Sequence, residues 1–304
     1  MEKFEVDELL NLAIMSKTPY FIVEGVDDIC IYERIAESAR IECEVYSIDM
    51  ISGMIGGNNA IISAMHSLEN LPMPGTSKVH HFITGIVDRD ARPYRNEMPT
   101  LQSILCLNFY SIESHFASEH SIKPAITKLT RISQRDQINI TEILSTIESQ
   151  LSYLYYFSLD ALKGATTPTY ISTVGFSTNV GRRKDGNTIT QIATKAPELD
   201  AFAASHHLTN SLPSMREFTK GKWLLTAFSE ELFGAICDLK TKCKGAIIQK
   251  CRMCAVDADA ACLFTLRDGF TKTSLYSTIL EFVDSPDFDY IRDRMSLVAS
   301  TSRT

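Results

Sequence analysis

Short apolar runs alternate with amphipathic helical stretches over roughly the first 120 residues, and this alternation limits the possible folds more than any other feature. Four runs have the length and composition of strands: "YFIVEG", "ECEVYSID", "HHFITGIVDRD" and "TLQSILCLNF". Strands that alternate with helices indicate a parallel sheet between helical layers. We therefore predict an α/β fold with a mostly parallel sheet flanked by helices.

Apolar residues at helical spacing mark the segments between these runs and most of the chain beyond residue 121. The segments for which we predict helix are residues 7–16, 27–40, 56–71, a stretch near Ile112, 124–164, 214–236, 246–266 and 272–283. The chain is thus expected to contain a sheet region, residues 1–120, followed by a mainly helical region, residues 121–304.

Two segments of the helical region lack the helical pattern. Residues 165–200 are rich in Thr, Ser, Gly and Asn and include "GRRKDGN", which predicts an exposed loop or a short hairpin. The tail at residues 299–304, "ASTSRT", is expected to fray.

The composition is that of a soluble globular protein, with 44% hydrophobic and 22% charged residues. No apolar run is long enough to span a bilayer, so no membrane partner is expected. The N-terminus is acidic and amphipathic, unlike a signal peptide. Eight cysteines scattered through 304 residues suggest a reducing cytoplasm and not a disulfide scaffold.

The formal net charge is −7, whereas proteins that hold nucleic acid constitutively are usually basic. Any contact with nucleic acid is therefore expected to be local or transient. The same charge could favour docking on a basic partner.

Carboxylates follow two of the strand-like runs. Glu24 ends "YFIVEG", and Asp88 and Asp90 end "HHFITGIVDRD", where alternation sets the two aspartates on one side of an extended segment. If the two strands are neighbours, the three carboxylates converge and repel one another unless a cation is shared. Hard oxygen ligands predict Mg²⁺ or Mn²⁺. Asp27 and Asp28 are expected only to cap the helix that follows.

Four cysteines near the C-terminus follow a symmetrical spacing. Cys251 and Cys254 form a C-x2-C pair, and Cys243 and Cys262 lie at equal distances on either side. Zinc binding is one explanation. Because the intervening "AVDADAACLFTL" has a helical pattern, we expect buried structural cysteines instead.

The order strand-"EG", helix-strand-helix, strand-"DxD" over residues 18 to 120 resembles the Toprim fold of topoisomerases, primases and nucleases of the overcoming-lysogenisation-defect type. The later segments "FYSIESHF" and "KGKWLL" resemble segments of Toprim nucleases in the DUF4435 group. By this resemblance Glu113 would join the metal shell and Lys222 would contact phosphate. Ser114 stands where the group often has Asn. Trp223 is expected to anchor a core or an interface.

The layout as a whole is most similar to the nuclease effectors of PARIS anti-phage systems. This resemblance implies that an ABC-type ATPase partner holds the Toprim nuclease inactive and releases it when a phage anti-restriction protein is sensed. The free effector would form a homodimer and cleave host tRNA. It also implies that the helical region serves dimerisation, partner docking and substrate contacts.

Basic side chains could supply phosphate contacts despite the acidic net charge. The candidates are Arg89, Arg92, Arg95, Arg182, Arg183 and Lys184. Two alternatives stay open: a DNA nuclease that uses the same carboxylates, and a non-catalytic regulatory subunit whose acids only cap helices and form a docking surface.

Overall fold

The computed structural model describes residues 3–73, 75–133 and 135–303. The chain forms two compact units, one of residues 1–112 with 283–304 and the other of residues 113–282. The predicted division at residue 120 differs from this arrangement, because the C-terminal segment packs with the sheet and not with the helical unit.

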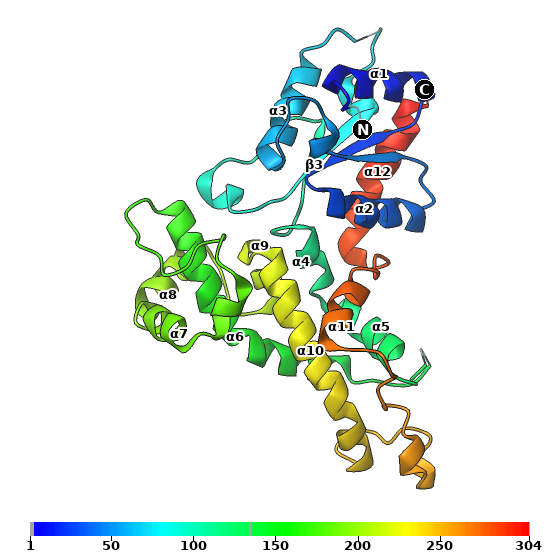
Figure 1. The fold of residues 1–304 in the computed structure, drawn as a ribbon, viewed down its shortest axis with the longest axis vertical. Helices are drawn as coiled ribbons and strands as arrows, with labels where there is room; N and C mark the ends of the chain where they lie inside the picture. The colour runs from blue at the N-terminus through cyan, green and yellow to red at the C-terminus, as the bar shows by residue number, and fades with distance from the viewer. Residues whose placement is uncertain (1–2, 74, 134, 304) are drawn as a thin grey trace. The chain divides into compact units, whose positions relative to one another are not determined.

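The first unit is built on a parallel sheet of four strands in the order β2-β1-β3-β4 (Figure 1). The strands are β1 (Tyr20–Val23), β2 (Glu44–Ser47), β3 (Ile83–Val87) and β4 (Ile104–Cys106). All three strand pairs are parallel. The predicted α/β class and parallel sheet are confirmed.

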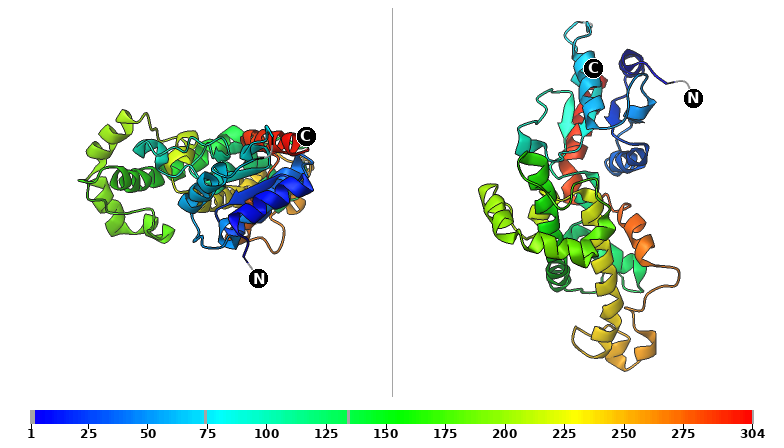
Figure 2. Two further views of the ribbon diagram at one scale, coloured as in Figure 1. Left: turned by 90° about the horizontal axis from the view of Figure 1, so that it is seen from above. Right: turned by 60° about the vertical axis from the view of Figure 1, so that its left-hand side comes forward.

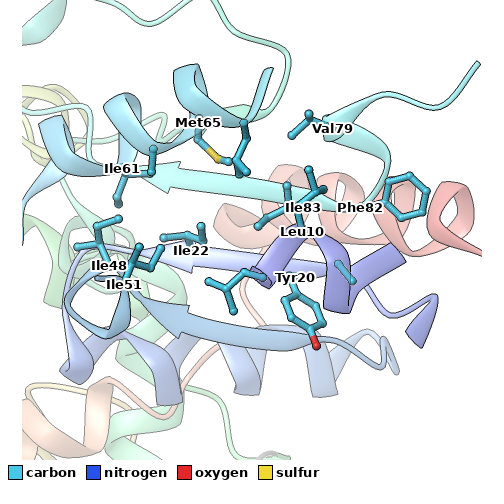
Figure 3. Close-up of a cluster of buried hydrophobic side chains, with 14 of the residues drawn as sticks. Leu10, Tyr20, Ile22, Ile48, Ile51, Ile61, Met65, Val79, Phe82 and Ile83 are labelled. Carbon is cyan, nitrogen blue, oxygen red and sulfur yellow. The ribbon is translucent and has the colours of Figure 1, made fainter. Parts of the chain in front are cut away.

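One face of the sheet packs against α1 (Val6–Ser16) and α3 (Asn58–Glu69). Side chains alternate between faces along a strand, so Ile22 and Ile83 point to the same layer as the helices. Figure 3 shows both among the buried side chains of this core, beside Leu10 and Met65. The packing of this layer fixes the position of α3, whose first residue belongs to the site described below.

The other side of the unit carries α2 (Val26–Ser38) and α12 (Asp289–Ser302), the red helix of Figure 1. Arg294 of α12 donates hydrogen bonds to the backbone oxygen of Gln102 and, at 3.4 Å, to Thr84 of β3. The prediction of a frayed tail was wrong up to residue 303: Ser302 is buried and donates to the backbone oxygen of Lys17 at 3.3 Å. Thr304 lies outside the described residues.

The second unit is mainly helical, as predicted. Its helices are α4 (Ile112–Phe116), which begins at the unit boundary, α5 (Glu119–Leu129), α6 (Ile140–Thr166), α7 (Gly186–Ala193), α8 (Ala196–Ser205), α9 (Leu212–Phe218), α10 (Gly221–Lys244) and α11 (Lys272–Ile279). The long helices α6 and α10 pack against each other. No helix among the described residues is long and apolar enough to cross a bilayer.

Several local predictions for this unit were wrong. The predicted helix at 124–164 is interrupted between α5 and α6, and the one at 214–236 is interrupted between α9 and α10. Residues 165–200 are not a single loop, because α7 and α8 begin within them and the longest stretch without regular structure is residues 167–179. The polar residues that suggested turns are helix caps: Asp185 accepts hydrogen bonds from the backbone of Thr188 at 2.9 Å and from its hydroxyl at 2.7 Å.

Residues 246–266 are not a helix either. After α10 (yellow in Figure 2) the chain makes two short 3-10 turns, Cys254–Val256 and Asp259–Ala261, in the golden segment at the end of the helix. The periodic apolar residues there include three cysteines that gather at one point instead of lining a helix face.

Gly85 of β3 allows α3 to lie close to the sheet. A Cβ at this position would lie 2.6 Å from Cγ2 of Ile61 and 2.9 Å from Sδ of Met65. We expect Gly85→Val to destabilise the first unit by about 1–3 kcal/mol through overpacking. Faster amide hydrogen exchange in β3 and α3 would reveal it. Gly234→Ala, in the middle of α10 with open space around the new methyl, is the control and should be neutral or stabilising. Unchanged exchange in Gly85→Val would contradict this account.

Candidate active site

The predicted carboxylates lie at the carboxyl ends of two hydrogen-bonded strands. Glu24 directly follows β1, and Asp88 directly follows β3. These strands are parallel neighbours with Ile22 level with Gly85, so continuing the register sets Glu24 level with the residue before Asp88. Both side chains are half-buried. The adjacency on which the sequence prediction depended is therefore present in the sheet.

Asn58, the first residue of α3, connects the two aspartates. Its amide nitrogen donates to the Asp90 carboxylate at 2.9 Å, and its amide oxygen accepts the backbone N–H of Asp88, also at 2.9 Å. Asn58 is itself buried, so its rotamer is held by packing as well as by these bonds. In the sequence this residue is marked only by its place within the predicted helix of residues 56–71, because its partners lie about thirty positions away.

The segment after β3 turns instead of continuing as a strand. Asp90 has φ +50°, a left-handed conformation that Asp tolerates better than most residues. Its backbone N–H donates to the backbone oxygen of Tyr110 at 2.9 Å. The expectation of an extended Asp88–Asp90 segment was wrong, because this turn and not strand alternation sets the direction of the Asp90 carboxylate.

The phenol of Tyr110 shares the electrostatic environment of the three acids. Burial is the main cause that raises its pKa, followed by the negative charges of Asp90 and Asp88, with a smaller contribution from Glu24. Arg95 acts in the opposite direction. Tyr110 therefore stays protonated and can donate a hydrogen bond within this acidic region.

Asp28 serves the capping role that was predicted. Its carboxylate accepts the backbone N–H of Gly25 at 3.0 Å at the start of α2. Asp27 is exposed on the first turn of the same helix, where a negative charge is favourable. The acidic stretch after β1 thus separates into Glu24, at the strand end, and residues that stabilise the helix.

The three arginines that follow Asp88 differ in accessibility. Arg92 is buried, and its guanidinium donates to Asn59 at 2.9 Å. Arg89 donates to the backbone oxygen of Asn108 at 3.3 Å. Arg95 forms an ion pair with Glu97 at 3.0 Å, and its side chain is 38% exposed. Of the three, Arg95 is therefore the side chain best able to move toward a ligand.

Glu113 and Lys222 both belong to the second unit. Glu113 lies on α4 and is half-buried, whereas the residues on either side of it, from 110 to 118, are all buried. Burial and, to a smaller extent, the charge of Glu113 raise the pKa of Tyr276 to about 12. The backbone that follows is held by buried Arg216, which donates to the backbone oxygens of Ser114 at 3.0 Å and His115 at 3.3 Å.

Lys222 is exposed on the first turn of α10. A cation at this end of a helix opposes the helix dipole, so the position is not explained by helix stability. The adjacent Trp223 is buried, and its indole N–H donates to the backbone oxygen of Thr178 at 3.1 Å, which confirms the predicted anchor. Lys220 is held differently, because its ammonium donates to the backbone oxygen of Phe176 at 2.7 Å.

The "GRRK" segment lies in a 3-10 turn, Val180–Lys184, whose residues are exposed at 181, 182 and 184 and buried at Arg183. Arg183 is only 3% exposed and pairs with Glu230 of α10. Lys184, which is exposed, contacts the same carboxylate at 2.6 Å. Arg183 is thus a buried ion-pair partner of Glu230. A contact between Arg183 and a substrate would require this ion pair to break, which costs free energy.

Glu230 collects three cations, the third being Lys272 at 3.2 Å. Burial would raise its pKa, but hydrogen bonds from Lys184 and Arg183 and the nearby positive charges lower it to about 2. Because the folded-state pKa lies below the unfolded value near 4.5, this carboxylate stabilises the protein fully above that pH. The contribution is lost as pH falls from about 4.5 toward 2.

We expect Glu230→Gln to lower the free energy of unfolding by about 3 kcal/mol at pH 7, because it leaves the buried Arg183 charge uncompensated. The gap between variant and wild type should narrow at pH 3. Urea unfolding followed by the fluorescence of Trp223, the single tryptophan, measures it in this unit. Glu231→Gln, at the adjacent position on α10, is the control. A gap that does not change with pH would contradict the prediction.

No protein-family model matches the chain, and no curated protein matches it. The candidate site is therefore defined by its residues and their geometry. The carboxylates at the ends of β1 and β3 are hard oxygen ligands of the kind that Mg²⁺ or Mn²⁺ prefers. Among the described residues, however, the group of His, Cys, Asp or Glu side chains that lies close enough to hold a metal ion is the four cysteines of the second unit, and Glu24, Asp88 and Asp90 do not form such a group.

Proposed function

We propose that the chain is a metal-dependent endonuclease of the Toprim type. The observation that carries the proposal is the position of Glu24 and Asp88 directly after two adjacent parallel strands, with Asn58 orienting Asp90 beside them. In open parallel sheets, ligands bind beyond the carboxyl ends of the strands. An acidic site at such an edge suits phosphoryl chemistry with a divalent cation.

Glu24, Asp88 and Asp90 would hold Mg²⁺ or Mn²⁺. Such an ion, when bound, stabilises charge on phosphoryl oxygens and lowers the pKa of water. Glu24 is also the residue that we propose to accept a proton, since it is half-buried at the strand end. By the resemblance of "FYSIESHF" and "KGKWLL" to segments of DUF4435 nucleases, Glu113 would be a further metal ligand and Lys222 would stabilise negative charge that develops on the phosphate.

We propose tRNA as the substrate and a PARIS-type defence system as the setting, with an ABC-type ATPase partner and a homodimer after release. This part of the proposal is supported by the "FYSIESHF" and "KGKWLL" segments and by the net charge of −7, which suits a stored toxin that does not bind RNA constantly. Phosphate contacts would come from Arg95, Arg182 and Lys184, with Arg89 and Arg92 supporting the acidic turn.

A cleavage assay on two substrates tests this function. Purified, partner-free protein is incubated with tRNA and with plasmid DNA in Mg²⁺, and parallel reactions contain EDTA. We expect tRNA cleavage that EDTA abolishes and that added Mg²⁺ restores. Cleavage of DNA alone would support the alternative DNA nuclease. Cleavage of neither substrate, with no binding of a divalent ion, would support the regulatory subunit.

A further inference from the structure

The four cysteines singled out by their spacing meet at one point in the second unit. The sulfur atoms of Cys243, Cys251, Cys254 and Cys262 all lie within 4.8 Å of one another, and all four residues are buried. The sulfurs of Cys251 and Cys262 are 3.9 Å apart. Four sulfurs placed tetrahedrally about 2.3 Å from a zinc ion lie about 3.8 Å from one another, so the cluster already has almost the required size.

The ligands come from three places in the chain. Cys243 lies on the last turn of α10, the C-x2-C pair ends at Cys254, the first residue of the first 3-10 turn, and Cys262 follows the second. The backbone N–H of Cys251 donates to the sulfur of Cys243 at 3.2 Å, and that of Leu263 donates to the sulfur of Cys251 at 3.4 Å. Hydrogen bonds of this kind stabilise the thiolate form, which is the form that binds metal.

The segment that carries the cluster has almost no other core. From residue 245 to residue 271, the buried residues are Phe264 and the cysteines of the cluster. The chain there forms only two short 3-10 turns. A stretch with so little apolar burial cannot offset the entropy of ordering by packing alone. A metal ion that binds only the folded form would supply the missing free energy.

The charge around the cluster also favours a metal–thiolate centre. Four thiolates leave a Zn²⁺ centre with two excess negative charges, which need nearby cations. The sequence around the ligands contains five basic residues, Lys240, Lys242, Lys244, Lys250 and Arg252. Two of them are paired elsewhere, Lys250 with Asp257 at 3.9 Å and Arg252 with Asp136 at 3.4 Å, which leaves the three lysines at the end of α10. A disulfide would instead require two sulfurs about 2.05 Å apart, and all eight cysteines are free thiols.

We propose that Cys243, Cys251, Cys254 and Cys262 bind one structural Zn²⁺ ion that closes the segment between α10 and α11. Four-cysteine tetrahedral sites select zinc or iron. With four protein ligands the coordination is closed, so the site has a structural and not a catalytic role. The site is independent of the proposed nuclease centre.

Elemental analysis of the full-length protein, purified without chelator, tests the assignment. We expect about one zinc per chain. Cys251→Ser and Cys262→Ser should reduce the zinc content by at least about tenfold, because each removes a ligand. Cys30→Ser and Cys237→Ser are the controls, since these thiols are exposed, and they should retain the metal.

A titration of the wild-type protein covers the case in which the ligand variants fail to fold. An organomercurial reagent is added stepwise, and released zinc is followed with a chromophoric chelator. Zinc should leave in proportion to the buried thiols that react. Protein that is purified with four free thiols or with disulfides and no zinc would overturn the proposal, as would iron in place of zinc.

Discussion

Replacing Glu24 by Gln should reduce nucleic-acid cleavage by about a thousandfold or more while leaving the first unit folded. The change removes one negative charge and one strong cation ligand from the end of β1 but keeps the size of the side chain. Proton transfer by a positioned side chain is worth about 10²–10⁴ in rate, and the loss of a metal ligand adds to this. Cleavage rates at saturating Mg²⁺ measure the loss.

Glu33→Gln is the matched control for this experiment. Glu33 is an exposed glutamate on α2, nine positions after Glu24. The Glu33→Gln substitution removes the same negative charge at a position away from the sheet edge, so this variant should cleave as fast as wild type. Binding of Mn²⁺, measured directly, should weaken in Glu24→Gln alone. A Glu24→Gln variant that cleaves and binds Mn²⁺ normally would remove Glu24 from the site.

Asp160→Asn should destabilise the second unit by about 3–5 kcal/mol, the largest stability effect that we expect from a single substitution in this chain. Asp160 lies on α6 and is completely buried. Its partners are all donors: the Tyr170 hydroxyl at 2.5 Å, the backbone N–H groups of Thr173 at 2.7 Å and Val174 at 2.8 Å, and the Lys195 ammonium at 3.2 Å. An amide in this place would turn its own NH₂ group toward donors and leave the ammonium without its charge partner.

The fluorescence of Trp223 reports this loss in the second unit. The Trp223 ring packs edge-on against Phe157 of α6, three residues before Asp160. It also lies next to Phe176, two residues after Val174, which donates to the Asp160 carboxylate. The urea midpoint should therefore fall in Asp160→Asn. Asp200→Asn is the control, because Asp200 is exposed and accepts one hydrogen bond, from Tyr156 at 3.0 Å. Equal midpoints for both variants would show that the network is not needed for stability.

The candidate carboxylates could be predicted because they depend on local pattern. Short apolar runs predicted β1 and β3, and the acids that follow them occupy the strand ends. The connection through Asn58 could not be predicted, because its two partners lie about thirty residues away and come close only when α3 packs on the sheet. The tight approach at Gly85 has the same origin.

The errors beyond residue 121 each involve contacts that the local sequence pattern does not record. Polar residues such as those near 185 occur both in loops and at the starts of helices. Only the helix that follows shows which of the two structures they form. The apolar periodicity of residues 246–266 came from cysteines that face one another instead of one side of a helix. The tail is ordered up to residue 303 because α12 packs in the sheet unit. Arg294 of α12 donates hydrogen bonds to Thr84 of β3 and to Gln102, just before β4.

The sequence by itself determined the four strands and the helices α1, α2 and α3 of the first unit, the parallel α/β class and the presence of acids after two strands, because these depend on period and on neighbours along the chain. It did not predict α12. The tertiary structure decided that β1 and β3 are adjacent, that α12 returns to the sheet, and that four cysteines spread over twenty residues share one point. Each of these is a contact between distant segments, whose free energy comes from packing and charge and leaves no periodic trace in the sequence.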